Sequence, residues 1–206
     1  MFVGAGLVAA CGGRGGQPPG VPPLVKRADG KEYHLVVKGA YKAYYDLYGQ
    51  LQIIEYDENG DGRPDHIAHH DGKKKPHLIE IDEDYDGKID RWEDYDAQGK
   101  LVKVGVSRRG NGPDLWTYFG PSGAPIKKEY DEDGDGKVDR IEWLEAGEVA
   151  RVELDTDRDG KIDRWQVWRN GKLVSEDLDT NGDGRPDKRI DYSVAGAPLR
   201  LEPLPR

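Results

Sequence analysis

A nine-residue acidic motif of the form Asp-x-Asp/Asn-x-Asp-Gly-x-x-Asp recurs along the chain at intervals of 24 or 25 residues. Intact copies start at Asp57, Asp82, Asp131, Asp155 and Asp179. The longer interval between the second and third copies holds a degenerate copy near Ser107, which retains Asn111, Gly112 and Asp114 and contains Arg108 and Arg109. A fixed period of this length is typical of repeat proteins, whose units are stabilised by their neighbours rather than by one central core.

Glycines between the motifs mark a second turn in each unit, at Gly49, Gly72, Gly99, Gly123, Gly147, Gly171 and Gly196. Asn170-Gly171 and Asp71-Gly72 are strong signals for β-hairpin turns. The segments between the turns, such as 164–168 and 172–178, are too short and too rich in β-branched and aromatic residues for helices. We therefore predict an all-β fold over residues 30–206, an antiparallel meander of about six 24- to 25-residue β-hairpin repeats, elongated or curled. Its last strand is expected around residues 199–201.

Apolar residues flank each acidic motif. One directly precedes the first Asp, at Tyr56, Ile81, Val106, Tyr130, Leu154 and Leu178. Another lies two residues beyond the last Asp, at Ile67, Trp92, Trp116, Ile141 and Trp165, whereas Arg189 takes this place in the final unit. We expect these two sets to form cross-strand pairs that close the base of each loop.

The five intact motifs concentrate eighteen aspartates into short loops, so their mutual repulsion requires a counter-ion. Carboxylate oxygens at positions 1, 3, 5 and 9, a carbonyl at position 7 and Gly at position 6 suit Ca²⁺, which takes six to eight oxygen ligands. Mg²⁺ is a weaker alternative because it retains its waters and demands octahedral geometry. We predict about five Ca²⁺ sites. Binding of Ca²⁺ at these sites would be coupled to folding of the chain. The predicted ligands are Asp57, Asn59, Asp61, Asp65, Asp82, Asp84, Asp86, Asp90, Asp131, Asp133, Asp135, Asp139, Asp155, Asp157, Asp159, Asp163, Asp179, Asn181, Asp183 and Asp187.

These loops resemble those of EF-hand proteins, most closely at residues 82–93 and 131–142, where Glu93 and Glu142 occupy position 12. The resemblance implies calcium ligation, but the short connections leave no room for the two helices of an EF-hand. The loops are also similar to the Asp-rich calcium loops between strands of integrin-type propeller blades. Thrombospondin type 3 repeats share the Asp spacing but depend on cysteines that are missing here. Residues 95–101 show a weaker resemblance to the hairpins of YD (Rhs-type) repeats.

The N-terminus resembles a bacterial lipoprotein signal. Residues 1–10 are small and apolar and precede Cys11, the single cysteine, although no Lys or Arg comes before them. The resemblance implies cleavage before Cys11, lipidation of that residue, and a flexible Gly/Pro-rich tether over residues 12–29. Gly12 after the cysteine, by resemblance to lipoprotein sorting signals, favours the outer membrane of the bacterial cell envelope.

Composition and scattered residues limit the function. The net charge of −9 and the lack of a clustered basic surface argue against nucleic acid, the only basic run being Lys73 to Lys75. No nucleophile with a base and an orienting group can be assembled, so we predict no enzymatic activity.

Three groups of residues leave alternatives open. The histidines of the first hairpin either bind Zn²⁺ or face solvent: His66, His69, His70 and His77. Arg108 and Arg109 either replace the ion of the degenerate loop or reflect drift. The tryptophans either line a sugar- or peptide-binding face or pack on neighbouring strands: Trp92, Trp116, Trp143, Trp165 and Trp168.

Together these features predict a calcium-stabilised, lipid-anchored envelope protein that acts as a non-catalytic binding or spacer module. Its expected partners are the membrane, through the anchor, and a protein or glycan ligand. The alternatives are an EF-hand-type calcium sensor and a calcium-dependent carbohydrate-binding adhesin.

Overall fold

The computed structural model describes residue 20 and residues 22–110, 112–193 and 195–204. The described residues form sixteen β-strands and no helix, and hence contain no helical segment that could cross a membrane. The strands are β1 (Leu24–Lys26), β2 (Glu32–Lys38), β3 (Tyr41–Tyr45), β4 (Leu51–Tyr56), β5 (His66–His69), β6 (Leu78–Ile81), β7 (Arg91–Tyr95), β8 (Leu101–Val106), β9 (Leu115–Phe119), β10 (Pro125–Tyr130), β11 (Arg140–Glu145), β12 (Glu148–Leu154), β13 (Arg164–Arg169), β14 (Lys172–Leu178), β15 (Lys188–Tyr192) and β16 (Pro198–Pro203).

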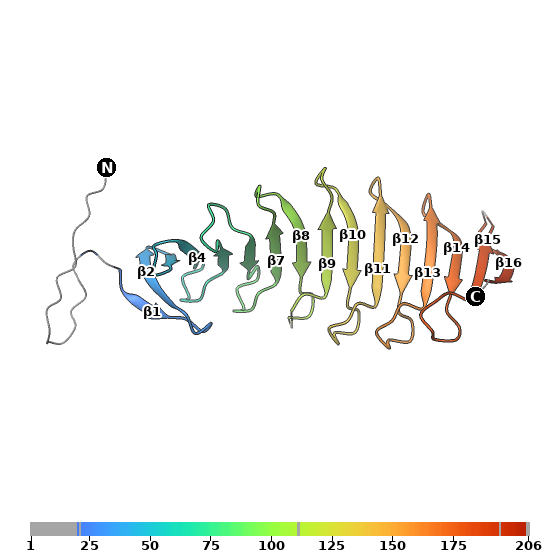
Figure 1. Ribbon diagram of the computed structural model, residues 1–206, viewed down its shortest axis with the longest axis horizontal. Coiled ribbons are helices and arrows are strands. Elements are labelled where there is room, and N and C mark those ends of the chain that lie inside the picture. Colours follow the sequence, from blue (N-terminus) through green and yellow to red (C-terminus); the bar gives the residue numbers. More distant parts are fainter. Residues whose placement is uncertain (1–19, 21, 111, 194, 205–206) are drawn as a thin grey trace.

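All sixteen strands belong to one sheet, in which each strand pairs antiparallel with the next in sequence. The sheet is an open meander, elongated along the direction of strand addition (Figure 1). This confirms the predicted all-β fold, and β16 confirms the predicted last strand. The sheet starts earlier than the predicted boundary at residue 30, because Leu24–Lys26 of the predicted tether pairs with residues 32–34 of β2.

The turns divide into two sets. The acidic motifs form the connections from β4 to β5, β6 to β7, β10 to β11, β12 to β13 and β14 to β15, so they all lie along one edge of the meander. The degenerate copy connects β8 to β9 in the same row. The Gly-containing turns lie along the opposite edge. At Asn170-Gly171 both residues have positive φ, 50° and 69°, as a two-residue hairpin turn requires.

The predicted cross-strand pairing at the loop bases is wrong by one residue. Tyr56 lies opposite His66, and Ile67 lies opposite Glu55, so Tyr56 and Ile67 face opposite sides of the sheet. The same register recurs at the other loops, where Ile81 faces Arg91 and Trp92 faces Glu80. The reason is that the last Asp closes the loop by donating its backbone N–H to the residue before the first Asp, for example from Asp65 to Tyr56 at 2.8 Å. The first strand pair therefore starts immediately after the motif.

The sheet is a single layer in the part of the chain that the structure describes, so its hydrophobic core is thin. Tyr33, Tyr44 and Ile53 form the main buried cluster, against which Val25 and Ile67 pack. Elsewhere most strand residues on both faces are half-buried. Polar contacts between strands therefore supplement hydrophobic burial.

A recurring contact joins a tyrosine hydroxyl and a cation to one glutamate. Tyr44 donates to Glu55 at 2.7 Å, and Arg27 pairs with the same carboxylate. Desolvation and the hydrogen bond to Glu55 raise the pKa of Tyr44 to about 12. The same arrangement recurs in four further sets: Tyr95, Glu93 and Arg91; Tyr118, Glu129 and Lys127; Tyr130, Glu142 and Arg140; Tyr192, Glu176 and Arg164. In four of the five sets the tyrosine and the glutamate lie on neighbouring strands, so the contact ties those strands together where no second layer covers them. Tyr95, Glu93 and Arg91 all lie on β7, so their contact stays within one strand.

Candidate calcium-binding loops

The five intact motifs share one backbone geometry. The glycine at position 6 has a φ between 84° and 94° in each loop, a region that residues with a Cβ rarely adopt. Its N–H donates to the carboxylate of the first Asp, which holds that side chain over the loop. The distances are 3.0 Å for Gly62 to Asp57, 2.8 Å for Gly87 to Asp82, 2.9 Å for Gly136 to Asp131, 2.7 Å for Gly160 to Asp155 and 2.6 Å for Gly184 to Asp179.

The side chains at positions 3 and 5 are held in the same way. In the loop that starts at Asp131, the carboxylate of Asp133 accepts from the backbone N–H of Asp135 at 3.1 Å, and that of Asp135 accepts from Lys137 at 2.8 Å. Equivalent hydrogen bonds occur in the other four loops. The loops are thus folded around their acidic side chains as the sequence predicts.

The Asp at position 9 has a structural role that the sequence did not reveal. Its carboxylate accepts backbone N–H groups from the start of the loop, as Asp65 does from Glu58 at 2.5 Å and from Asn59 at 3.0 Å. Asp65 is only 1% exposed. In the first four intact loops the backbone carbonyl of this residue also accepts the N–H of the residue that begins the next loop, for example Asp65 from Asp82 at 2.8 Å, whereas that of Asp187 accepts from Leu204. Position 9 therefore locks its own loop and joins it to its neighbour.

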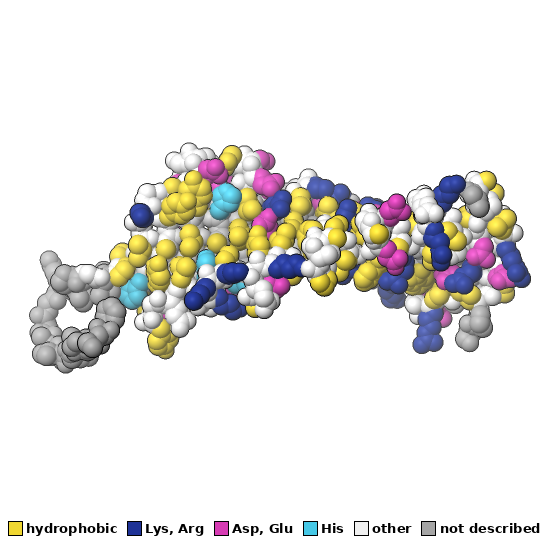
Figure 2. All heavy atoms as spheres, turned by 90° about the horizontal axis from the view of Figure 1, so that it is seen from above, with side chains coloured by type: hydrophobic (Ala, Val, Ile, Leu, Met, Phe, Trp, Pro, Cys, Tyr) yellow, Lys and Arg dark blue, Asp and Glu magenta, His cyan; other side chains and the backbone are white. Residues whose placement is uncertain are grey.

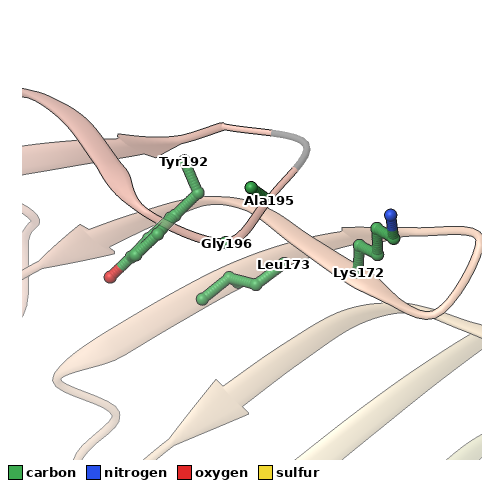
Figure 3. A pocket seen from close by; sticks show the side chains of 5 residues that line it. All are labelled: Lys172, Leu173, Tyr192, Ala195 and Gly196. Atoms are coloured by element: carbon green, nitrogen blue, oxygen red, sulfur yellow. The ribbon is translucent and has the colours of Figure 1, made fainter.

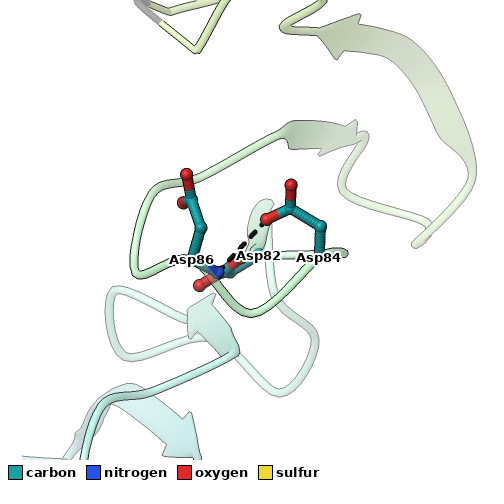
Figure 4. Close-up of side chains that lie close together, drawn as sticks. All are labelled: Asp82, Asp84 and Asp86. Atoms are coloured by element: carbon teal, nitrogen blue, oxygen red, sulfur yellow. Dashed lines mark hydrogen bonds between the residues drawn. The ribbon is translucent and has the colours of Figure 1, made fainter.

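Three loops bring three carboxylates together with ligand oxygens within 4.8 Å of one another. The groups are Asp82, Asp84 and Asp86; Asp131, Asp133 and Asp139; and Asp155, Asp157 and Asp163. The first group is drawn in Figure 4, where the backbone of Asp86 bonds the carboxylate of Asp84. The loops that start at Asp57 and Asp179 have Asn59 and Asn181 at position 3, so a carboxamide oxygen replaces one carboxylate.

One carboxylate oxygen of Asp82 indicates that these residues fit a cation. Asp82 is 2% exposed, and its Oδ1 is buried without a hydrogen-bond partner. A buried carboxylate oxygen without a donor is costly unless a cation ligates it. At Asp179, desolvation opposes ionisation, but four backbone N–H groups, led by that of Gly184, outweigh it and hold the pKa of Asp179 below its ordinary value. The oxygen-rich donor set of the loops suits a hard divalent cation such as Ca²⁺.

The position-12 glutamates of the EF-hand resemblance belong to none of the three-carboxylate groups. Glu93 accepts from Tyr95 at 2.5 Å and pairs with Arg91 at 2.6 Å. Glu142 accepts from Tyr130 at 2.9 Å and pairs with Arg140. Both residues follow the loop on a strand rather than on a helix, and their side chains contact tyrosine and arginine side chains of the sheet.

The degenerate loop contains a protein cation. The Arg108 guanidinium pairs with Asp114 at 2.7 Å through Nε, and its Nη2 lies 3.4 Å from the Asp114 carbonyl oxygen. Ser107 Oγ accepts from the Gly110 N–H at 2.9 Å, in the role that the first Asp has in the other loops. Of the two alternatives for Arg108, this geometry favours replacement of the ion.

Arg158 is a functional candidate that the sequence did not single out. It occupies position 4, has a φ of 63°, and reaches Asp133 of the preceding loop at 3.4 Å. Three of the four other intact loops have Gly at this position. The arginine in place of this glycine is the feature of the sequence that could have pointed to Arg158.

The histidines do not assemble a metal site in the described part of the chain, where the only groups of three potential ligands are the aspartate groups above. His66 pairs with Tyr56 across the sheet, and His69 with Ile53, so the two histidines point to opposite faces. His69 instead contacts Glu80 at 2.7 Å, and its hydrogen bond lowers the pKa of Glu80 despite desolvation.

Tryptophan contacts favour packing over ligand binding. Lys103 Nζ lies 3.5 Å from the centroid of Trp116, whose ring also packs against Gly105, since a Cβ built there would lie 2.5 Å from it. Arg151 lies 4.8 Å from the centroid of Trp143. Cys11, the predicted lipidation site, lies outside the described residues.

Two of the acidic loops are similar in sequence to a known protein family. A family model described as EF hand matches residues 128–145 and 153–164. Both matched segments are loops with flanking strands. No curated protein matches the chain significantly.

The chain is also similar to parts of larger solved structures. One is that of accessory secretory protein 1, 2 and 3 in Streptococcus pneumoniae, with 16% identity, a TM-score of 0.38, and coverage of 53% of this chain and 20% of that chain. Another is that of a mutant of S. aureus TarM in complex with Fondaparinux, alpha-GlcNAc-glycerol and UDP, with 9% identity, a TM-score of 0.18, and coverage of 68% and 20%. The chain spans about a fifth of each of these chains.

Proposed function

We propose that this chain is a calcium-stabilised, non-catalytic spacer or binding module of the bacterial cell envelope. The observation that carries the proposal is the common geometry of five acidic loops along one sheet edge, with the buried, unpartnered Oδ1 of Asp82 in one of them. The elongated single-layer sheet supports a spacer role, since it has a long axis along which the repeats add (Figure 1). Lipidation of Cys11 would anchor the N-terminal end.

Within each loop, the carboxylate or carboxamide oxygens of positions 1, 3 and 5 and the carbonyl of position 7 would hold the ion. Position 9 would complete the site at Asp139 and Asp163, which belong to the three-carboxylate groups. A bound Ca²⁺ supplies two positive charges that remove the repulsion between the carboxylates.

The size of that repulsion explains why the ion would stabilise the fold. Two carboxylates at 4.8 Å, the upper limit for the ligand oxygens within these groups, repel by about 3.5 kcal/mol at an effective dielectric constant of ~20, and by about 1 kcal/mol in water. Calcium at 100 times its dissociation constant stabilises the folded state by about 2.7 kcal/mol per site. Five such sites give about 13 kcal/mol, comparable with the whole stability of a typical domain, about 5–15 kcal/mol.

Calorimetric titration of the chelator-treated full chain with Ca²⁺, with thermal melts in parallel, tests the proposal. We expect about five ions per chain and a large rise in melting temperature. Mg²⁺ at the same concentration serves as the control and is expected to stabilise less. Fewer than three ions, or an unchanged melting temperature after chelation, would overturn the proposal.

The anchor and the alternatives are tested separately. Cys11→Ala is expected to move the protein from the membrane fraction to the soluble fraction without changing calcium binding. The EF-hand sensor with paired helices is wrong for the described residues, because strands flank every loop there. The adhesin alternative has less support, because the rings of Trp116 and Trp143 already contact cations of the sheet.

A further inference from the structure

The connection between β5 and β6 departs from the repeat. It spans residues 70–77, whereas the two following connections on the same edge span 96–100 and 120–124. The additional length carries Lys73, Lys74 and Lys75, the basic run of this acidic chain. Insertions into single repeats commonly lie on the binding face of a repeat protein.

A hollow of about 420 Å³ opens beside this connection. Residues 73–77 line one side, and Tyr95, Asp96 and Ala97 of the neighbouring strand end and turn line the other. Similar hollows lie between later turns. One of about 360 Å³ is lined by Lys172, Leu173, Tyr192, Ala195 and Gly196 (Figure 3), and another of about 460 Å³ by Glu148, Val149, Trp168, Asn170 and Gly171. The hollow beside β5–β6 differs from these two in its three lysines.

The polar groups of this hollow are only partly used. Lys75 Nζ donates to the carbonyl oxygen of Gln98, which holds its side chain against the next turn. Lys73 and Lys74 form no ion pair with any described residue. His77, which also lines the hollow, has a buried Nδ1 without a hydrogen-bond partner.

Two carboxylates face the same region and reduce its positive charge. Asp71 lies 3.4 Å from His77 Nε2. Asp96 accepts the backbone N–H groups of Gln98 and Lys100, both at 2.9 Å, so one of its oxygens is engaged in its own turn. The three lysines still leave the hollow with an excess of positive charge.

The acidic loops are too distant to cancel this charge. The five residue steps from His77 to Asp82 along β6 span about 17 Å at roughly 3.3 Å per residue. This exceeds the Debye length of about 8 Å at physiological ionic strength. Figure 2 views the molecule from the side of the short turns, where dark-blue Lys and Arg side chains stand among hydrophobic ones.

We propose that the hollow between the β5–β6 and β7–β8 connections binds a phosphate group, carried either by a lipid headgroup or by a soluble phosphate ester. Lysine ammonium groups bind phosphate as point charges, and a protonated imidazole nitrogen can donate to a phosphate oxygen. Two exposed lysines without an ion-pair partner, Lys73 and Lys74, together with Lys75 around an open hollow, suit an anion with several exposed oxygens. The site does not depend on calcium ligation by the acidic loops, so its failure and the failure of the calcium proposal are distinguishable.

The experiment uses the full chain in saturating Ca²⁺, with two probes. Sedimentation measures binding to phosphatidylcholine vesicles with and without about 30% phosphatidylglycerol, a composition we choose as roughly that of an anionic membrane surface. Amide chemical shifts measure binding of inorganic phosphate and glycerol phosphate. The test variant is K73S/K74S/K75S, which keeps the turn length, and the control is K26S/K31S/K38S, which removes the same charge from three other lysines.

We expect shifts confined to residues 71–77 and 95–97 on adding a phosphate compound, or binding to the anionic vesicles alone. The first result identifies a soluble ligand and the second a lipid. The test variant should bind on the order of 100-fold more weakly, from the usual contribution of three lysines at an anionic surface, while the control binds as wild type. Unchanged melting temperatures would show that both variants are folded. Equal losses in the two variants, shifts elsewhere, or no binding to either probe would overturn the proposal.

Discussion

Replacing Arg108 by alanine would show whether a side chain does the work of a metal ion in the degenerate loop. The carboxylate of Asp114 is only 5% exposed, and the Arg108 guanidinium 2.7 Å away is its charged partner. Arg108→Ala would leave this carboxylate with the backbone N–H of residue 108, at 3.2 Å, as its remaining donor in that contact. We therefore expect the variant to be destabilised although no calcium ligand has been changed.

The exposure of the two side chains sets the size of the effect. Removing one partner of a fully buried ion pair costs about 3–5 kcal/mol. The Arg108 side chain is 47% exposed, so solvent screens part of this interaction, and we expect about 1–2 kcal/mol. For a chain of this size, that corresponds to a fall in melting temperature of about 2–8 °C.

Thermal melts in saturating Ca²⁺, with calorimetric titration in parallel, provide the assay. The number of bound ions should stay the same in Arg108→Ala, because this loop is expected to bind none. Arg185→Ala removes an arginine from an intact loop and serves as the control, with a melting temperature close to wild type. An unchanged melting temperature in Arg108→Ala, or one additional bound ion in the wild type beyond the five intact loops, would refute the reasoning.

Two further changes test single contacts. Asp82→Asn should lower the number of bound ions by one and reduce the melting temperature in Ca²⁺, whereas Glu83→Gln beside it should do neither; calorimetry that finds equal stoichiometry in both variants would contradict this. Glu80→Gln tests pH dependence: the hydrogen bond from His69 lowers the pKa of Glu80 in the folded state, so its stabilisation is present above the unfolded value of about 4.3 and is lost as the pH falls through the lower folded value. Melts between about pH 3 and 7 should show a difference from wild type that disappears at the acidic end, and a constant difference would be evidence against this assignment.

The acidic repeat was sufficient to predict most of the fold, because its period also fixes where the strands must run. Between Asp163 and Asp179 only enough residues remain for two short strands and the Asn170-Gly171 turn, and β13 and β14 occupy that space. The first strand was not predicted, because residues 24–26 lack the motif and follow a Gly/Pro-rich segment. Only their pairing with β2 marks them as a strand.

The sequence predicted which residues make up the candidate site, but not what each of these residues contacts in the folded loop. The resemblance to EF-hand loops gave the same weight to positions 1, 3, 5 and 9, although Asp65 and its equivalents also bond the backbone of the loop. Glu142 matches position 12, but it lies on β11 and accepts from the Tyr130 hydroxyl instead of joining the carboxylate group of the loop. Spacing along a sequence does not specify which backbone N–H or side chain a carboxylate will meet, and this depends on the register of the folded strands.

The backbone hydrogen bond that joins one acidic loop to the next limits how such a chain can change its length. Asp139 accepts from Asp155, and Asp163 accepts from Asp179, so the junction on either side of a unit is chemically the same. Duplicating one whole unit of the gene would therefore insert a link that already fits both neighbours and would extend the molecule by two strand spacings, about 9.6 Å. Loss of a single strand would instead send every later loop to the wrong edge, so growth and shortening should proceed in whole units.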